Sequence, residues 1–151
     1  VDVKTSERRW RELDEYLFPQ VADGAARIAR AGGLVGMGSH GEMPGLGFQW
    51  EMQAHVMGGM TPREVLHAAT MGAAATIGRE REFGSLEAGK YADLLVLDRN
   101  PLLDIAHALD LDFVMKNGRL YDADTLDEVW PRQRPLGPLW FQDDKPRVTR
   151  H

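Results

Sequence analysis

The chain has 151 residues, of which 43% are hydrophobic, so it is long enough to bury one core and too apolar to be disordered throughout. Eighteen basic and 23 acidic residues give a net charge of −5, which argues against nucleic acid or an anionic membrane as a partner. The absence of cysteine excludes disulfides and thiolate metal sites, so a metal would need histidine, carboxylate or other oxygen ligands.

The first part of the chain is predicted to contain three helices and one short strand. Residues 5–16 and 21–31 have apolar side chains at helical spacing, and Gly32 and Gly33 end the second helix. Residues 34–38 form a short apolar run after a helix, which is typical of a buried strand. A glycine-rich loop over 39–47 leads to a third helix over 48–57. Val21, Ala25, Ile28 and Ala29 are expected to lie on one stripe of the second helix, and Trp50, Met52 and Met57 in the third are expected to form core.

The second part is predicted to change from helix to strands. Thr61, Pro62 and Glu64 match a capping box with proline at the first helical position, so a helix should start here and end at Gly78. A strand is expected over 92–97. Asn117-Gly118 between two apolar runs predicts a hairpin over 113–121, and the proline-interrupted stretch 130–140 should lie over a surface as a tail. The buried face of the capped helix is expected to consist of Val65, Leu66, Ala69, Ala73 and Ile77.

The run from Gly36 to Gly41 matches G-x-G-x-x-G, the fingerprint of dinucleotide-binding folds. That interpretation requires a helix starting at the third glycine and a second strand ending in an acidic residue about 20 residues later. Pro44 and two more glycines intervene, and helical sequence occupies the place of the second strand. We therefore favour a loop at the C-terminal end of a barrel strand, where barrel folds place their functional groups.

The stretch from Gly58 to Pro101 reads GGMTPREVLHAATMGAAATIGREREFGSLEAGKYADLLVLDRNP, a capped helix, a glycine-punctuated turn and a compact apolar strand. It resembles the C-terminal signature of the metal-dependent amidohydrolase superfamily, which includes imidazolonepropionase-like and prolidase-like enzymes. The resemblance extends over residues 34–121. The ending Asp127-Glu128-Val129-Trp130-Pro131 is similar to a subgroup associated with TolB-like propeller domains.

The resemblance implies an α/β fold, namely the C-terminal portion of a (β/α)8 TIM-type barrel plus part of a small accessory β-sandwich. Residues 1–80 would hold the terminal barrel helices and the last barrel strand, residues 81–125 part of the sandwich with its hairpin, and residues 126–151 a tail. Family members complete the sandwich with N-terminal strands. We therefore expect the missing N-terminal part of the same protein as a partner, and we expect the open sheet edge to favour a homo-oligomer.

The resemblance also points to site residues in the loop after the predicted strand. The last barrel strand of the superfamily typically ends in Gly-Thr-Asp or Gly-Ser-Asp, whose carboxylate binds metal or takes a proton from the attacking water. Here the pattern is Gly38-Ser39-His40, so an imidazole replaces the carboxylate. An imidazole can bind zinc, shuttle protons or hydrogen-bond a substrate carbonyl, and a carboxylate two residues later could act if the loop turns back. The candidates are His40 and Glu42 for catalysis, His40 for the metal, and Ser39, Phe48 and Trp50 for substrate binding.

Several polar residues have a structural interpretation beside or in place of a functional one. His40 could cap the loop by hydrogen bonding, and Glu42 could simply be solvated. His55 lies four residues after Glu51, so a pair on one helix face is expected. Asp93 is expected to bond turn amides. His67 is expected to be packed or exposed on its helix, and His107 to lie on a helix surface.

The function that the resemblance implies is hydrolysis of C–N bonds in small amide, cyclic amide or peptide-like substrates at a divalent metal, with zinc as the first choice. A hydrolytic zinc needs about three protein ligands and one open position. This chain offers one or two, so by itself it is expected to bind no metal and to be inactive. The rival from another class is a non-catalytic interaction or structural module derived from the same fold. A His-x-His pair after an apolar strand upstream of Val1 would favour the enzyme.

Overall fold

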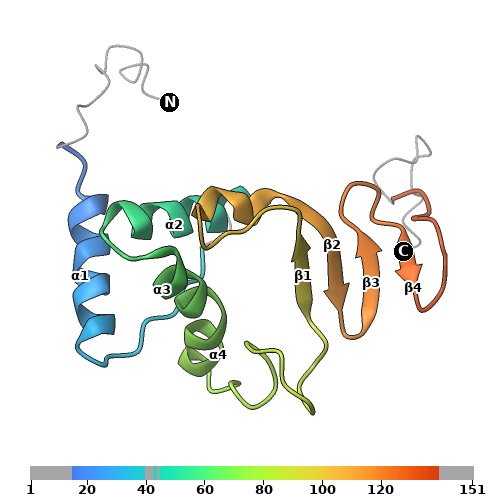
Figure 1. The fold of residues 1–151 in the computed structure, drawn as a ribbon, viewed down its shortest axis with the longest axis horizontal. Helices are drawn as coiled ribbons and strands as arrows, with labels where there is room; N and C mark the ends of the chain where they lie inside the picture. Colours follow the sequence, from blue (N-terminus) through green and yellow to red (C-terminus); the bar gives the residue numbers. More distant parts are fainter. Residues whose placement is uncertain (1–14, 40–42, 44, 140–151) are drawn as a thin grey trace, which may run out of the picture.

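The computed structural model describes residues 15–39, 43 and 45–139, and Figure 1 shows its helices on one side and its sheet on the other. The helices are α1 (Phe18–Arg30), α2 (Leu46–Met57), α3 (Pro62–His67), the π-helical turn η3 (Ala68–Gly72), α4 (Ala73–Thr76) and the 3-10 helix η4 (Ile105–Leu109). The strands are β1 (Leu94–Leu97), β2 (Leu111–Lys116), β3 (Arg119–Asp122) and β4 (Glu128–Trp130). They form one antiparallel sheet in the order β1-β2-β3-β4. In the described part of the chain, no helix is long and apolar enough to cross a bilayer.

The helix α1 starts three residues before the predicted boundary and ends before Gly32, which has a φ of 83°. Pro19 lies in its first turn, where the missing N–H interrupts no helical hydrogen bond. The predicted helix over 5–16 lies almost wholly outside the described residues. Of the residues predicted to share one stripe of this helix, Val21 and Ile28 are 71% and 54% exposed. The helix packs on α2 through small residues instead, with Ala22 and Ala26 buried.

The helix α2 confirms the predicted third helix and begins two residues earlier. Met52 is buried as expected, whereas Trp50 and Met57 are 51% and 53% exposed, so their predicted burial was wrong. A helix has 3.6 residues per turn, so positions two or five residues from Met52 point to other sides of the helix. The core cluster around Met52 consists of Ala26, Met37, Met60, Val65, Ala68, Ile105 and Ala108.

The predicted capping box is confirmed at the start of α3. The hydroxyl of Thr61 accepts a hydrogen bond from the Glu64 N–H at 3.3 Å, and the Thr61 N–H donates to the Glu64 carboxylate at 2.7 Å. Arg30, at the end of α1, donates to both carboxylate oxygens of Glu64 at 3.0 and 3.1 Å and to the carbonyl of Gly59 at 2.7 Å. The Arg30 guanidinium, helped by Thr61, lowers the pKa of Glu64 to about 2. One carboxylate thus joins the end of α1 to the start of α3.

The predicted helix over 61–78 is present, but it is not a uniform α-helix. The π-helical turn η3 interrupts it, and Gly78 ends it with a φ of 69°. Val65 and Ala68 are buried in the core, whereas Ile77 is 65% exposed, so its predicted burial was wrong.

Residues 34–38 were predicted to form a strand, and the structure assigns none there. A strand needs a neighbouring strand to complete its hydrogen bonds, and the described residues place no strand beside this segment. The Met37 N–H donates instead to the carbonyl of Ala68 at 3.1 Å, and the Met37 side chain is 5% exposed. The segment is therefore held by a helix.

The predicted hairpin is confirmed. Asn117 and Gly118 connect β2 to β3 with φ values of 49° and 75°, the left-handed values that a two-residue hairpin turn of this kind requires. The predicted role of Asp93 is also confirmed, since its carboxylate accepts the Asn117 N–H at 2.6 Å and pairs with Lys116. Lys116, followed by the Asn117 amide, lowers the pKa of Asp93.

At the other end of the sheet, β4 is covered by the segment that follows it. Glu128 is 4% exposed and forms ion pairs with Arg119 and Arg134. The backbones of Glu128 and Arg134 also exchange two hydrogen bonds, at 2.9 and 2.8 Å. The β4 edge is thus paired over this stretch, unlike the edge of β1.

We expect Glu64→Gln to lower the melting temperature at pH 7, because the neutral amide cannot form the charged pair with Arg30. The pKa of Glu64 is depressed to about 2, so the pair contributes its full stability above the ordinary glutamate pKa of about 4.3 and loses it as pH falls toward 2. The difference in melting temperature between the two proteins should therefore shrink between pH 4.5 and pH 2. Circular dichroism melts check this, with the exposed Glu80→Gln as control. A difference that stays constant down to pH 2 would contradict the assignment.

Candidate functional site

The segment that leads to the candidate site is fixed by two close backbone contacts. A Cβ added to Gly72 would collide with the carbonyl oxygen of Val35. A Cβ added to Gly36 would collide with the hydroxyl of Thr76 and lie 3.0 Å from the Cα of Ala73. Only glycine permits an approach of this kind, so the sequence fixes the position of residues 35–37 against the helix.

The loop after this segment carries the predicted catalytic residues, and its two ends lie close together. Ser39 is exposed, and its hydroxyl would be 3.4 Å from a Cβ added to Gly47 in the first turn of α2. The Gly47 N–H donates to the carbonyl of Met43 at 2.9 Å. His40 and Glu42 lie outside the described residues, between these two ends. Their roles as catalytic residues, and that of His40 as a metal ligand, stay predictions.

The predicted substrate-binding residues on α2 are not on one side of the helix. Phe48 is half-buried and packs against the core cluster, whereas Trp50 is exposed. Two residues along a helix correspond to a rotation of about 200°. Of the two, Trp50 has the more exposed side chain, and the substrate-binding roles of both residues stay predictions.

The dinucleotide-binding alternative does not fit the fold. Among the described residues, the first helix after Gly36 and Gly38 is α2, which begins at Leu46, five positions after the third glycine of the motif at position 41. A phosphate held in that way needs the helix N-terminus directly after the glycine loop. The next strand along the described chain is β1, far beyond the spacing that the fingerprint requires.

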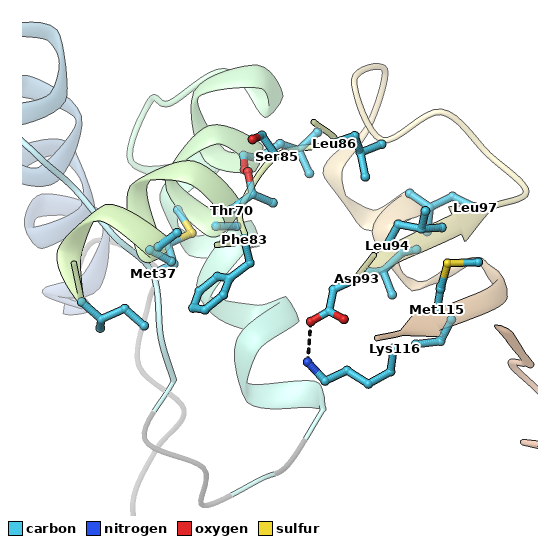
Figure 2. Close-up of a pocket in the computed structure, with 18 residues that line it drawn as sticks. Met37, Thr70, Phe83, Ser85, Leu86, Asp93, Leu94, Leu97, Met115 and Lys116 are labelled. Atoms are coloured by element: carbon cyan, nitrogen blue, oxygen red, sulfur yellow. Dashed lines mark hydrogen bonds and ion pairs between the residues drawn. The ribbon is translucent and has the colours of Figure 1, made fainter. Parts of the chain in front are cut away.

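A large apolar cavity lies between the helices and the sheet, and sequence reasoning did not anticipate it. Its volume is about 720 Å³, and Figure 2 shows its residues on both sides of an open space. One wall comes from η3 and α4, the other from β1 and β2, and the connecting loop adds Phe83 and Leu86. Met37 lines it, whereas Ser39, Phe48 and Trp50 do not. The continuous apolar run of β1 was the signal that could have indicated it.

The polar side chains around this cavity are engaged in local bonds. The hydroxyl of Thr70 donates to the carbonyl of Leu66 at 2.7 Å. Lys90 donates to the hydroxyl of Ser85 at 2.6 Å, and Ser85 bonds Glu87. Asp93 pairs with Lys116, as Figure 2 shows. The cavity therefore has the character of a surface for apolar contact and offers no free general base among the residues that the structure describes.

The remaining described histidines each have different surroundings. His55 has a buried Nδ1 without a hydrogen-bond partner among the described residues, and the same holds for one oxygen of Glu51. The predicted pair of these two residues is wrong, since it is not among the described ion pairs. His67 lines a second cavity of about 290 Å³, and the Nδ1 of His107 lies 2.9 Å from the carbonyl of Asn100.

The part of the chain that the structure describes contains no group of three or more histidine and carboxylate side chains that could hold a metal ion. The predicted donors, an imidazole and a carboxylate two residues apart in the loop, lie outside the described residues, so their role as metal ligands stays a prediction. Such a pair supplies nitrogen and oxygen, both of which divalent zinc accepts. Two donors are fewer than a hydrolytic zinc requires, so further ligands must come from outside this set.

Comparison with known proteins gives a consistent result. Residues 15–121 match the model of the amidohydrolase family. The imidazolonepropionase of Shouchella clausii is 47% identical over 64 residues, which cover 40% of this chain and 14% of that protein.

Two solved structures extend the similarity to the fold. A Xaa-Pro dipeptidase with methionine bound in its active site is 31% identical, with a TM-score of 0.60, over 69% of this chain and 26% of that one. A putative prolidase from Bifidobacterium longum is 36% identical, with a TM-score of 0.59, over 77% of this chain and 27% of that one. The chain thus spans about a quarter or less of these relatives.

We expect Gly72→Ala to destabilise the chain by about 1–3 kcal/mol, because the added methyl group must displace the Val35 carbonyl. The matched control is Gly24→Ala in the interior of α1, where nothing lies within 4 Å of the added Cβ. That substitution should stabilise by about 0.5–1 kcal/mol, because alanine loses less backbone entropy than glycine in a helix. Urea unfolding measures both, and equal effects would show that the contact at Gly72 does not constrain the fold.

Proposed function

Because the chain belongs to the amidohydrolase family, we propose that it forms part of a metal-dependent hydrolase that cleaves C–N bonds in amides or cyclic amides. The observation that carries this proposal is the match over residues 15–121, which includes the loop with the candidate site. The named activities of the relatives, imidazolonepropionase and Xaa-Pro dipeptidase, support small cyclic amides and proline dipeptides as the substrate class. The chain covers a minor share of each relative, so the activity would belong to the complete fold, of which this chain is one part.

We further propose that residues 1–80 are the terminal helices and last strand of a (β/α)8 barrel, that residues 81–125 are part of an accessory β-sandwich, and that residues 126–151 are a tail. Two features support this. The segment at residues 34–38 has the composition of a barrel strand, and the described residues place no strand beside it. The four-stranded sheet lies beside the helices, as an accessory layer would.

In this proposal the loop after Met37 places three polar side chains at the rim of the barrel. His40, as a neutral imidazole, would hold the metal through one ring nitrogen or move a proton between water and substrate. Glu42 would accept the proton of the attacking water. Ser39, exposed next to the first turn of α2, would donate its hydroxyl to a substrate oxygen, and Trp50 would wall the pocket. The divalent metal, zinc as first choice, would supply a water of lowered pKa and polarise the scissile carbonyl.

A non-catalytic interaction module is the second candidate. The observation that favours it is the apolar cavity, whose polar lining groups are taken up by local bonds. A module would use this surface for contact and would not need the loop residues. Loss of activity on substitution of His40 distinguishes the two, because the module has no activity to lose.

The test grafts these 151 residues in place of the matching segment of the Bifidobacterium longum prolidase and measures hydrolysis of Xaa-Pro dipeptides. We expect His40→Ala to lower kcat at least tenfold, which corresponds to about 1.4 kcal/mol of transition-state stabilisation. His67→Ala is the control, because His67 lines a different cavity beside Gly33 and Val35. Metal analysis separates the two roles, since loss of metal identifies a ligand and retained metal identifies a proton carrier.

Unchanged kinetics of the His40→Ala graft with unchanged metal content would remove His40 from the mechanism. A graft that folds, binds metal and hydrolyses no amide would remove the proposed activity. The chain alone is expected to hydrolyse none of these substrates.

A further inference from the structure

The segment that follows β4 takes no part in the proposed chemistry. Residues 131–139 read PRQRPLGPL, and every residue from 131 to 138 is exposed. Residues 135–139 belong to no helix and no strand. We call residues 132–138 the proline segment. Its sequence, its backbone and its charge together indicate what it could bind.

The backbone of the proline segment is biased toward the polyproline II helix. The rings of Pro135 and Pro138 fix φ at about −65°, which is close to the polyproline II value. The residues before them, Arg134 and Gly137, are disfavoured in the α region for steric reasons and adopt extended backbone. Gly137 is not among the glycines with positive φ, so it does not turn the chain in the left-handed direction.

The proline segment is held beside the sheet at two points. The backbones of Arg134 and Glu128 exchange hydrogen bonds at 2.9 and 2.8 Å. The Leu136 N–H donates to the Asp127 carboxylate at 2.7 Å. Because these bonds order the segment in advance, a partner that binds it loses less conformational entropy than with a free peptide.

The spacing of the prolines matches a known mode of peptide recognition. A polyproline II helix has three residues per turn, so residues three positions apart lie on the same edge. Pro135 and Pro138 therefore share one edge, and Arg134 and Gly137 share the next. A P-x-x-P pattern of this kind docks in grooves that are lined by aromatic side chains.

Arg132 adds a cation at one end of the proline segment. It precedes Pro135 by three residues, is exposed, and forms no salt bridge among the described residues. The salt bridges of this region join Arg119 and Arg134 to Glu128 instead. A cation in this place is complementary to a groove that has carboxylates at one end, which fixes the direction in which the segment docks.

We propose that residues 132–138 are a docking segment for a protein domain whose aromatic-lined polyproline groove has an acidic border, as in SH3 domains. The two prolines fill the groove, and Arg132 pairs with carboxylates at its border. The docking does not depend on the proposed hydrolase activity, because none of these residues belongs to the candidate site.

The test titrates the full isotope-labelled chain with an SH3 domain that binds R-x-x-P-x-x-P peptides. We expect saturable binding, with NMR shift changes centred on the amides of the proline segment. Pro135→Ala and Pro138→Ala should each weaken binding by about tenfold, because alanine neither fixes φ nor fills the groove. Gln133→Ala is the matched control, since this exposed residue lies in the same segment but on neither of the two edges.

Two further variants check the charge and the ordering of the segment. Arg132→Ala should weaken binding and also reduce its salt dependence, because one screened ion pair is lost. Asp127→Ala removes the acceptor of the Leu136 N–H and should weaken binding by about threefold, because the segment must then be ordered on binding. Circular dichroism of each variant verifies that it is folded.

Four outcomes would overturn the proposal. The first is the absence of saturable binding to this domain. The second is binding that survives both proline substitutions. The third is equal binding to a variant of the domain whose groove tryptophan is replaced by alanine, which would place the contact outside the aromatic groove. The fourth is a set of shift changes confined to the residues of the apolar cavity, which would assign the contact to that surface.

Discussion

The close contact of residues 35–37 with the helix that starts at Pro62 determines how the rest of the structure is arranged. Gly36 and Gly72 let the two backbones touch, and the Met37 N–H completes the contact by donating to Ala68. Met37 thereby enters the core next to Val65 and Ala68. The loop that carries the candidate site starts two residues later, so its origin is fixed by backbone packing and not by its own polar groups.

The features that sequence predicted correctly are local ones. The capping box at Thr61 and Glu64 and the hairpin at Asn117-Gly118 depend on residues close in sequence, and the bonds of Asp93 depend on the turn amide that this hairpin presents. Their physical requirements are visible in the sequence, because a left-handed turn needs asparagine or glycine and a helix start needs an oxygen acceptor.

The features that sequence predicted wrongly depend on distant partners. Trp50, Met57 and Ile77 are apolar and exposed, because residue type alone does not tell which side of a helix its tertiary neighbours cover. The segment at 34–38 has the composition of a strand but no strand beside it. For the candidate site, sequence indicated the loop and its residue types, and the structure locates its ends at Ser39 and Gly47. The apolar run of β1 indicated an apolar surface, but the position of the cavity could not be predicted, because its opposite wall comes from helices far away in the chain.

The buried Glu128 has a consequence for how this sheet can aggregate. Arg134 pairs with Glu128 through both its side chain and its backbone. This part of the β4 edge is therefore closed to pairing with a strand of another molecule. Amyloid-like stacking needs two unpaired sheet edges on each molecule, so that each edge can hydrogen-bond to a neighbouring molecule. A molecule with one sheet edge already paired can add a foreign strand only at its other edge. Strand exchange through this sheet therefore gives a small oligomer and not a fibre.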